Sequence, residues 1–516
     1  MMPKQMTFAH LATILSTFDL NISSIEGQLA AGSTYAQLTN DSREINAGDV
    51  FCAIDGENQH GRQYIEQVIE SGCALILAEC KTAAEHGDIS FSTYITESAA
   101  TSTRENPRRK NIAIIEFYQL NQQLFEVAKR YYQAPQNDMD IIGITGTNGK
   151  TTTCQLLAQL IDATGEQAAV IGTNGAGRLS HLLPIKNTTP GATELHQLFD
   201  RFKQQHINYT VMEVSSHALV QRRVLSDLFD IAIYTNLSRD HLDYHGDMAS
   251  YAAAKHLIFS ENADQIAVIN TDDEIGRQWA SKLNKLQTLI VYGRDVNLCK
   301  QAYFVGAENI VHHANGLSFT LITHLGDIAV TSPLMGDFNV DNLLASIAAL
   351  MALALKDKNK PGVDLMTLAE NILSLKAIKG RMELFSQDST GKDNISKSAV
   401  VVVDYAHTPD ALENALIACK QHCQGQLWVV FGCGGDRDQG KRPLMGTIAE
   451  RLADHVILTT DNPRNESSEN IIKNILAGCK KPENIDTIVD RKEAVLTTLK
   501  KAGKNDVVLL AGKGHE

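Results

Sequence analysis

Short apolar runs that alternate with helical stretches constrain the fold of this chain more than any other feature. From about residue 138 onward, runs such as "MDIIGITG", "INYTVMEVSSH" and "QIAVINTDDE" are separated by stretches with helical apolar spacing. This alternation is typical of βαβ units, which build a mostly parallel sheet. Ligands of such sheets bind at the carboxyl ends of the strands. We therefore predict an α/β protein whose functional residues follow the apolar runs.

Two further series of apolar runs indicate more than one domain. A second series begins after "GRMELF" and includes "AVVVVDYAHT", "LWVVFGCGGDRD" and "DHVILTTDNPR", each ending in a polar loop. A shorter alternation, with "GDVFCAIDG" and "CALILAEC", precedes residue 138. A chain of 516 residues is also too long for one ordinary core. The sequence predicts three domains, with boundaries at residues 1–137, 138–377 and 378–516.

Charge and composition exclude several classes of protein. The net charge of -13 argues against a general nucleic-acid surface. The N-terminus lacks a basic start followed by an apolar core, and "LLASIAALMALAL" is shorter than a membrane span. The nine cysteines scatter without C-x-x-C pairs, which argues against a disulfide framework or a zinc ribbon. We expect a cytoplasmic protein with no nucleic-acid partner and no membrane insertion.

The stretch "GITGTNGKTTTCQLL" predicts a phosphate-binding loop. Gly146 and Gly149 allow the backbone N–H groups to turn inward, Lys150 can reach the β- and γ-phosphates, and Thr151 can offer a hydroxyl to Mg²⁺. An apolar helical stripe follows, so the helix N-terminus would point at the phosphates. The stripe consists of Leu156, Leu157, Leu160 and Ile161. The first glycine of the standard pattern is absent, and a plain Gly/Asn turn is the alternative interpretation.

Polar residues at the ends of the next apolar runs are candidates for a metal site. Glu213 ends "VMEVSSH" and His241 lies in "TNLSRDHLDYHGD". Both are expected in the same crevice, where a carboxylate and an imidazole could hold a second Mg²⁺. Taken alone, each is more often an ordinary loop residue, and Lys255 in "YAAAKHLIF" is by default a solvated helix lysine.

Several motifs together resemble the Mur ligases. They are "TGTNGKTTT", "EVSSHALVQRR", "TNLSRDHLDYHG", "YAAAKHLIF", "GDFNVDN", "DYAHTPDAL" and "GGDRDQGKRP", and the likeness runs from "NDSR" near residue 40 to the end of the chain. The tetrapeptide "DNPR" is similar to that of the members that accept meso-diaminopimelate rather than L-lysine. The resemblance implies an N-terminal domain for the UDP-substrate, a central ATP-binding domain and a C-terminal Rossmann-like domain for the amino acid.

The resemblance also implies a reaction. The γ-phosphate of ATP goes to a carboxylate of UDP-N-acetylmuramoyl-L-alanyl-D-glutamate and gives an acyl phosphate. The amine of meso-diaminopimelate then attacks, which adds a residue to the peptidoglycan stem peptide and releases ADP and phosphate. Phosphorylation is required because a carboxylate is a poor electrophile; the site must stabilise charge on the transferring phosphoryl group. A monomer that closes around its ligands is expected from the family.

Residue roles for ATP and metal follow from matching the family's motifs. The implied catalytic residues are Lys150, Glu213, His241 and Lys255. Thr151 and Glu213 would serve one Mg²⁺ and His241 the other, while Lys255 would react with CO₂ to form a carbamate that helps to place Mg²⁺. The implied ATP-binding residues are Gly146, Thr147, Asn148, Gly149, Lys150, Thr151, Thr152, Asn339, Asn342, Arg381 and Asp404.

Substrate-binding residues are implied in the same way. For the UDP-substrate they are Asn40, Ser42, Glu57, Asn58, Gln59, Asn187, Thr188, Thr189, Ser215, Gln221 and Arg223. For meso-diaminopimelate they are Arg437, Asp461, Asn462, Pro463, Arg464, Gly512 and Glu516. The two candidate amino acids differ by one distal carboxylate, onto which the Arg464 guanidinium could fork. A simple Asn-Pro turn is the alternative interpretation of "DNPR".

Other functions remain as alternatives at this point. The chain stops at Glu516, where family members usually continue, so a truncated and inactive nucleotide-binding homologue is one of them. A lysine-adding ligase is opposed by "DNPR", and a folylpolyglutamate synthase by "NTTP" and "NDSR". A dinucleotide-dependent oxidoreductase is opposed by "GCGGDRD", since Arg437 occupies the last glycine position of G-x-G-x-x-G.

Overall fold

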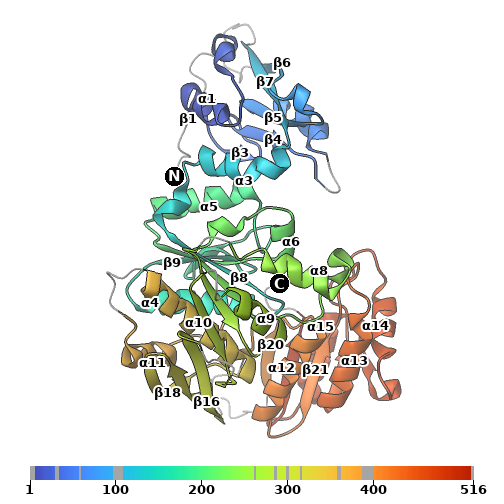
Figure 1. Ribbon diagram of the computed structural model, residues 1–516. Helices are drawn as coiled ribbons and strands as arrows, with labels where there is room; N and C mark the ends of the chain where they lie inside the picture. Colours follow the sequence, from blue (N-terminus) through green and yellow to red (C-terminus); the bar gives the residue numbers. More distant parts are fainter. Residues whose placement is uncertain are drawn as a thin grey trace, which may run out of the picture. The chain divides into compact units, whose positions relative to one another are not determined.

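The computed structural model describes residues 6–29, 34–56, 60–96, 108–260, 263–283, 287–297, 301–313, 316–356, 362–385 and 399–512. The chain divides into two compact units. The first comprises Met1–Met139, Pro190–Ile207 and Gln221–Leu225. The second comprises Asp140–Thr189, Asn208–Val220 and Ser226–Glu516, and contains two separate sheets. Figure 1 shows the elements coloured along the chain.

The first unit is built on a five-stranded sheet with the order β3-β4-β5-β7-β6. All neighbours are parallel except β6 and β7. Its strands are β3 (Leu38–Thr39), β4 (Val50–Ala53), β5 (Leu75–Cys80), β6 (Ile89–Thr96) and β7 (Arg108–Tyr118), beside a small pair β1 (Met6–Thr7) and β2 (Thr34–Tyr35). Its helices are α1 (Phe8–Ser16), α2 (Ile65–Glu70), α3 (Leu120–Tyr131) and α5 (Ala192–Gln204). Strands β4 and β5 are buried along their length, as expected for parallel strands covered on both faces.

The second unit contains an eleven-stranded sheet with the order β11-β10-β9-β12-β8-β13-β14-β15-β16-β17-β18. In this spatial order, the strands from β9 through β8 to β16 are parallel to one another, and antiparallel strands extend both edges of the sheet. The parallel strands are β8 (Asp140–Thr145), β9 (Ala168–Gly172), β12 (Tyr209–Glu213), β13 (Ile231–Tyr234), β14 (Ile266–Asn270), β15 (Leu289–Gly293) and β16 (Phe304–His313). The edges are β10 (Gly175–Arg178), β11 (His181–Leu183), β17 (Gly316–Thr323) and β18 (Gly326–Ser332).

Helices α4 (Lys150–Ala163) and α10 (Asp337–Lys356) pack together on this sheet, with α11 (Leu365–Leu373) beside them. The other helices of this part are α6 (Ser216–Val220), α7 (Leu242–His245), α8 (Met248–His256) and α9 (Glu274–Leu283). Helix α10 has 20 residues and is apolar enough to cross a membrane, yet 72% of its most apolar window is buried inside the protein. It serves as a core helix of the sheet, and it is longer than the apolar run that the sequence alone displayed.

The C-terminal sheet has the order β19-β20-β24-β21-β22-β23, parallel except for β19. Its strands are β19 (Glu383–Phe385), β20 (Val400–Asp404), β21 (Leu427–Phe431), β22 (His455–Leu458), β23 (Asp486–Thr487) and β24 (Val507–Ala511). Side chains alternate between two cores: one face packs on α12 (Pro409–His422), α13 (Lys441–Leu452) and α14 (Ser468–Leu476), the other on α15 (Arg491–Lys501). Every strand of the parallel core is thus covered by helices.

The predicted α/β class with mostly parallel sheets is confirmed. Each apolar run quoted for the three series forms a strand, and the stripe of Leu156, Leu157, Leu160 and Ile161 is buried in α4. The antiparallel edges were not predicted, because the β10–β11 hairpin is short and Gly-rich and the strands β16 to β18 have half-exposed faces. The proposed boundaries at residues 137 and 377 stay a prediction.

The burial of His196 on α5 makes the stability of the first unit dependent on pH. Its ring contacts Phe125 and Phe199, its Nδ1 lies 2.8 Å from the Ala192 carbonyl oxygen, and burial lowers its pKa to about 4. Below about pH 6.5 this histidine binds a proton in the unfolded chain but not in the folded protein, so the free energy of unfolding decreases as the pH falls.

We expect this single group to remove about 3 kcal/mol of the free energy of unfolding between pH 6.5 and pH 4. The substitution His196→Phe should flatten that part of the profile, measured by urea unfolding at successive pH values. The exposed His181 provides the control, since His181→Phe should leave the slope unchanged. An unaltered slope in His196→Phe would show that other groups cause the acid sensitivity.

Candidate functional site

A pocket of about 650 Å³ lies at the carboxyl end of β8 in the second unit. Strand β8 lies between β12 and β13. The chain runs from β8 to β9 on one side of this strand, and it later crosses from β12 to β13 on the other side. This is the topological position at which open α/β sheets bind ligands. The lining includes residues 147–152, which are the end of the loop between β8 and α4 and the first residues of α4, where the sequence predicted a phosphate loop.

The loop between β8 and α4 is pressed against the end of β13. Gly146 has φ +149°, and a Cβ added there would lie 1.8 Å from Thr235 Oγ1. The Thr235 hydroxyl donates to the Asn148 carbonyl at 2.6 Å, and the Asn148 N–H donates to Asn236 Oδ1 at 2.9 Å. Gly149 has φ +87°, and its added Cβ would lie 2.4 Å from Asn342 Oδ1. Glycine is therefore required at both positions, by backbone conformation and by space.

Two lysine side chains converge on this loop. Lys150 Nζ donates to the carbonyl oxygens of Gly146 and Thr147, at 2.8 and 2.9 Å. Lys255 Nζ also donates to the Gly146 oxygen, at 2.8 Å, and lies 4.4 Å from the ring centre of Tyr251. Burial lowers the pKa of both lysines, and the charge of Lys150 lowers that of Lys255 further. Lys255 is thus a buried member of the pocket and not a solvated helix lysine.

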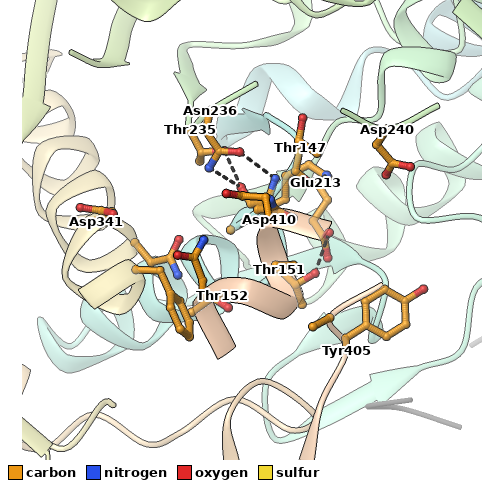
Figure 2. A pocket seen from close by; sticks show the side chains of 18 of the residues that line it. Thr147, Thr151, Thr152, Glu213, Thr235, Asn236, Asp240, Asp341, Tyr405 and Asp410 are labelled. Atoms are coloured by element: carbon orange, nitrogen blue, oxygen red, sulfur yellow. Dashed lines mark hydrogen bonds between the residues drawn. The ribbon is translucent and has the colours of Figure 1, made fainter. Parts of the chain in front are cut away.

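Glu213 lies at the end of β12, opposite the start of α4. The Thr151 hydroxyl donates to Glu213 Oε2 at 2.8 Å, and the Thr173 N–H donates to Oε1 at 2.8 Å. Arg381 Nη2 donates to Thr151 Oγ1 at 3.0 Å. Figure 2 shows Thr151 beside Glu213, with Thr152 on the next position of the helix. A carboxylate and a hydroxyl are therefore held side by side, which is a ligand pair suited to Mg²⁺.

His241 is the N-cap residue of α7, has φ +53° and lines the same pocket. Burial lowers its pKa to about 3, outweighing the nearby carboxylate of Asp240, whose Oδ2 lies 3.4 Å from His241 Nε2. The imidazole is consequently neutral at physiological pH and able to bind a metal through a ring nitrogen.

Asp240 is a pocket residue that the sequence interpretation missed. It is buried, with His407 Nε2 at 3.6 Å and Lys441 Nζ at 3.7 Å from its carboxylate oxygens. Burial acts to raise its pKa, but the interactions with His407, His241 and Lys441 outweigh it, so the pKa lies below its usual range. Asp240 is thus a buried carboxylate that lies beside two imidazoles and the Lys441 side chain.

The predicted nucleotide contacts outside the phosphate loop include two asparagines of α10 and Asp404 at the end of β20. Asn342 lines the pocket and donates through Nδ2 to Asn339 Oδ1 at 3.0 Å, while Asn339 donates to the Met335 carbonyl at 2.7 Å. The Asp404 carboxylate accepts from the N–H groups of Met382 and Ala406, both at 2.8 Å. Burial raises the pKa of Asp404.

Asp410 is a second pocket residue that was not foreseen. It lies in the first turn of α12, and its carboxylate accepts from Asn148 Nδ2 at 2.7 Å, so that α12 contacts the phosphate loop directly. Arg381, near the start of the C-terminal sheet, stacks over Tyr405 with its guanidinium 4.3 Å from the ring centre. The phosphate loop is therefore bordered by residues from the last third of the chain (Figure 2).

The predicted amino-acid residues lie on loops after β21, β22 and β24. Arg437 lines the pocket. Arg464 has φ +48° and donates from Nη1 to the Gly435 carbonyl at 2.7 Å. A Cβ added to Gly512 would lie 3.5 Å from Asp461 Oδ2, so the loops holding Asp461 and Gly512 are neighbours. Glu516 lies outside the described residues.

The predicted UDP-substrate residues are divided between the two units. In the first, Asn40 Oδ1 accepts from Thr193 at 2.8 Å; Ser42 and Arg223 are half-buried and Gln221 is exposed. Glu57, Asn58 and Gln59 lie outside the described residues. In the second unit, Asn187 is exposed, Thr188 lies 3.2 Å from Thr173 through their hydroxyls, and Thr189 donates to the Glu213 carbonyl at 2.9 Å and to Ser215 Oγ at 3.3 Å. Thr188 and Ser215 line the pocket.

Comparison with known proteins identifies the family. Three family models match in succession: "Mur ligase family, catalytic domain" over residues 34–132, "Mur ligase middle domain" over 144–350 and "Mur ligase, glutamate ligase domain" over 380–514. A "UDP-N-acetylmuramoyl-L-alanyl-D-glutamate--2,6-diaminopimelate ligase" from Haemophilus influenzae (strain 86-028NP) is 42% identical over 477 residues, 92% of this chain and 90% of that protein. The chain belongs to the Mur ligase family.

Two further Mur ligases agree with this assignment. The ligase of the same name from Vibrio vulnificus (strain YJ016) is 42% identical over 486 residues, which are 94% of this chain and 91% of that protein. A solved structure of a ligase with that name is 34% identical, with a TM-score of 0.59, and covers 94% of this chain and 90% of its own. The similarity to Mur ligases therefore extends through the three large sheets.

The close contact of Gly146 with Thr235 leads to a testable prediction. We expect Gly146→Ala to lower the affinity for ATP at least about tenfold, because the added methyl group forces the loop away from β13 and misaligns its N–H groups. Isothermal titration calorimetry would measure this.

Gly165→Ala is the matched control. Gly165 also has a positive φ, +88°, but an added Cβ meets nothing within 4 Å. This variant should lose some stability and keep its ATP affinity. Equal losses of affinity in both variants would show that backbone strain, and not the contact with Thr235, is responsible.

Proposed function

We propose that this Mur ligase uses ATP to join meso-diaminopimelate to UDP-N-acetylmuramoyl-L-alanyl-D-glutamate in peptidoglycan biosynthesis. The observation that carries the proposal is one pocket in which the phosphate loop, Glu213, His241 and Lys255 meet Arg437 from the C-terminal sheet. The names of the relatives that are 42% identical support the choice of substrates. A cytoplasmic location is part of the proposal, since ATP and the UDP-substrate are water-soluble; a monomeric state is part of it on the ground of the family resemblance alone.

The pocket supports phosphoryl transfer followed by amide formation. The backbone N–H groups at the start of α4 and the cation of Lys150 would hold the phosphates of ATP. The γ-phosphoryl group passes to the substrate carboxylate, and the amine then attacks the acyl phosphate, so that phosphate leaves and an amide forms. Arg381, stacked on Tyr405 and bonded to Thr151, is placed to neutralise charge on the phosphates.

The residues around Glu213 fit Mg²⁺. Thr151 and Glu213 would hold one ion and His241 a second, all with oxygen or neutral nitrogen ligands. Among the described residues no group of three or more His, Cys, Asp and Glu side chains is placed to hold a metal. This fits ions that are bound chiefly through the phosphates of ATP and water, as Mg²⁺ usually is. Bound Mg²⁺ supplies neutralisation of the developing phosphoryl charge.

Lys255 is suited to the proposed carbamate. Carbamate formation needs a neutral amine, and burial together with the charge of Lys150 lowers the pKa of Lys255 well below its usual value. The resulting anion would replace one of the two cations that now share the Gly146 carbonyl.

We therefore expect protein equilibrated with ¹³C-labelled CO₂ to show a carbamate carbon signal by NMR that is absent from Lys255→Arg. The ligase activity of that variant should fall by at least about a hundredfold, because an arginine cannot form the anion. Lys282→Arg, at an exposed position on α9, is the control and should keep both signal and activity. A signal that persists in Lys255→Arg would place the carbamate on another residue.

Arg464 provides the test of substrate choice. We expect phosphate release from ATP with the UDP-substrate and meso-diaminopimelate, and little with L-lysine. Arg464→Asn, which suits the left-handed backbone at φ +48°, should lower kcat/KM for meso-diaminopimelate by about a hundredfold and hardly change that for lysine. Wild-type activity with lysine equal to that with meso-diaminopimelate would refute the proposed specificity.

A further inference from the structure

Two loops of the C-terminal sheet are joined by an ion pair whose arginine is buried and whose glutamate is partly exposed. We call residues 432–439, after β21, and 459–467, after β22, the amino-acid loops. Arg442, in the first turn of α13, is fully buried, and its Nη1 and Nη2 donate to the two carboxylate oxygens of Glu466 at 2.8 and 2.7 Å. Arg442 Nη2 also donates to the Gly434 carbonyl at 3.2 Å. One guanidinium thus holds both amino-acid loops at once.

Further hydrogen bonds join the same loops. The Asp436 N–H donates to Glu466 Oε1 at 2.6 Å, so this carboxylate accepts from both loop and helix. Asp436 Oδ2 in turn accepts from Asn465 Nδ2 at 2.8 Å. The hydrogen bonds from Arg442 and Asp436 lower the pKa of Glu466 to about 2, so the carboxylate stays charged at any working pH.

The amino-acid loops pack so closely that there is no room for a side chain at Gly435. A Cβ added to Gly435 would lie 1.9 Å from the Pro463 oxygen, and one added to Gly434 would lie 3.0 Å from Arg464 Nη1. Asp436 and Arg464 both have left-handed backbone conformations, with φ +51° and +48°. Such conformations are costly for residues other than glycine and persist where the surroundings fix them. The contacts of Glu466 provide that fixation.

We propose that Arg442 and Glu466 are positioning residues for the incoming amino acid. They do not touch the substrate; they set the backbone from which Arg437 and Arg464 reach it, and so determine how well the enzyme separates a substrate with a distal carboxylate from one without. This inference rests on the proposed function, in which those two arginines bind meso-diaminopimelate. A bidentate site needs its guanidinium placed to within a fraction of an ångström, which a flexible loop does not provide.

The experiment compares conservative variants of this pair with those of a second pair on the same helix. Glu466→Gln removes the charge and Arg442→Lys removes the fork, while each keeps the size of the side chain. Arg451, also on α13, pairs with Glu413 at a more exposed position away from the amino-acid loops. Arg451→Lys and Glu413→Gln are therefore the matched controls. KM for each of the three substrates, kcat and the melting temperature would be measured for all variants.

We expect Glu466→Gln and Arg442→Lys to raise KM for meso-diaminopimelate about 10- to 100-fold and to reduce the preference over L-lysine. KM for ATP and for the UDP-substrate should stay within about twofold, and the double variant should be no worse than the poorer single one, because the two residues act as a unit. The control variants should show none of these changes.

Three results would overturn the inference: an unchanged KM for meso-diaminopimelate, an equal rise in KM for all three substrates, or a fall in melting temperature with unaltered selectivity. The wild-type enzyme tests the proposed function separately. If it prefers another amino acid, the proposed substrate is wrong, and the positioning role is then judged by the same comparison on the preferred amino acid.

Discussion

The carbonyl oxygen of Gly146 accepts hydrogen bonds from the half-buried Lys150 and the buried Lys255, and the rest of the site is arranged around this convergence. Burial disfavours the charged form of both Lys150 and Lys255; the charge of Lys150 further disfavours that of Lys255, and the charge of Arg381 that of Lys150. Glu213 and Asp240 offset part of this cost by their negative charge. A pocket of this kind favours the binding of a polyanion, because phosphate oxygens would supply the partners that the lysines now find in the backbone.

The convergence depends on the position of β8 in the sheet. A strand in the middle of a parallel sheet has neighbours on both sides whose carboxyl ends reach the same edge. Here β12 contributes Glu213, and the two residues directly after β13, Thr235 and Asn236, hold the phosphate loop by its backbone. Because Gly146 approaches Thr235 so closely, no larger residue would allow that contact. The loop conformation is therefore fixed by tertiary packing as much as by its own glycines.

The sequence allowed the strands, the phosphate loop and its lysine to be predicted, because apolar periodicity and glycine spacing are local signals. Glu213 and His241 could be proposed because they end apolar runs. Asp240, Asp410, Arg442 and Glu466 could not, since their roles arise from partners far away in the chain, such as Asn148 for Asp410. Lys255 shows the limit most clearly. Its helix position suggests solvent, and only the tertiary structure buries it.

The first turn of α13 links the two halves of the proposed chemistry. Lys441 lies 3.7 Å from Asp240, beside the phosphate loop, and its neighbour Arg442 holds the amino-acid loops through Glu466. Arg239, next to Asp240, also donates to Asp438 at 3.2 Å. Adjacent residues on one helical turn therefore contact both the side of the pocket that would hold phosphate and the side that would hold the amine. A shift of this turn would change both contacts together, so in the proposed reaction the acyl phosphate and the attacking amine would be positioned through one helical turn.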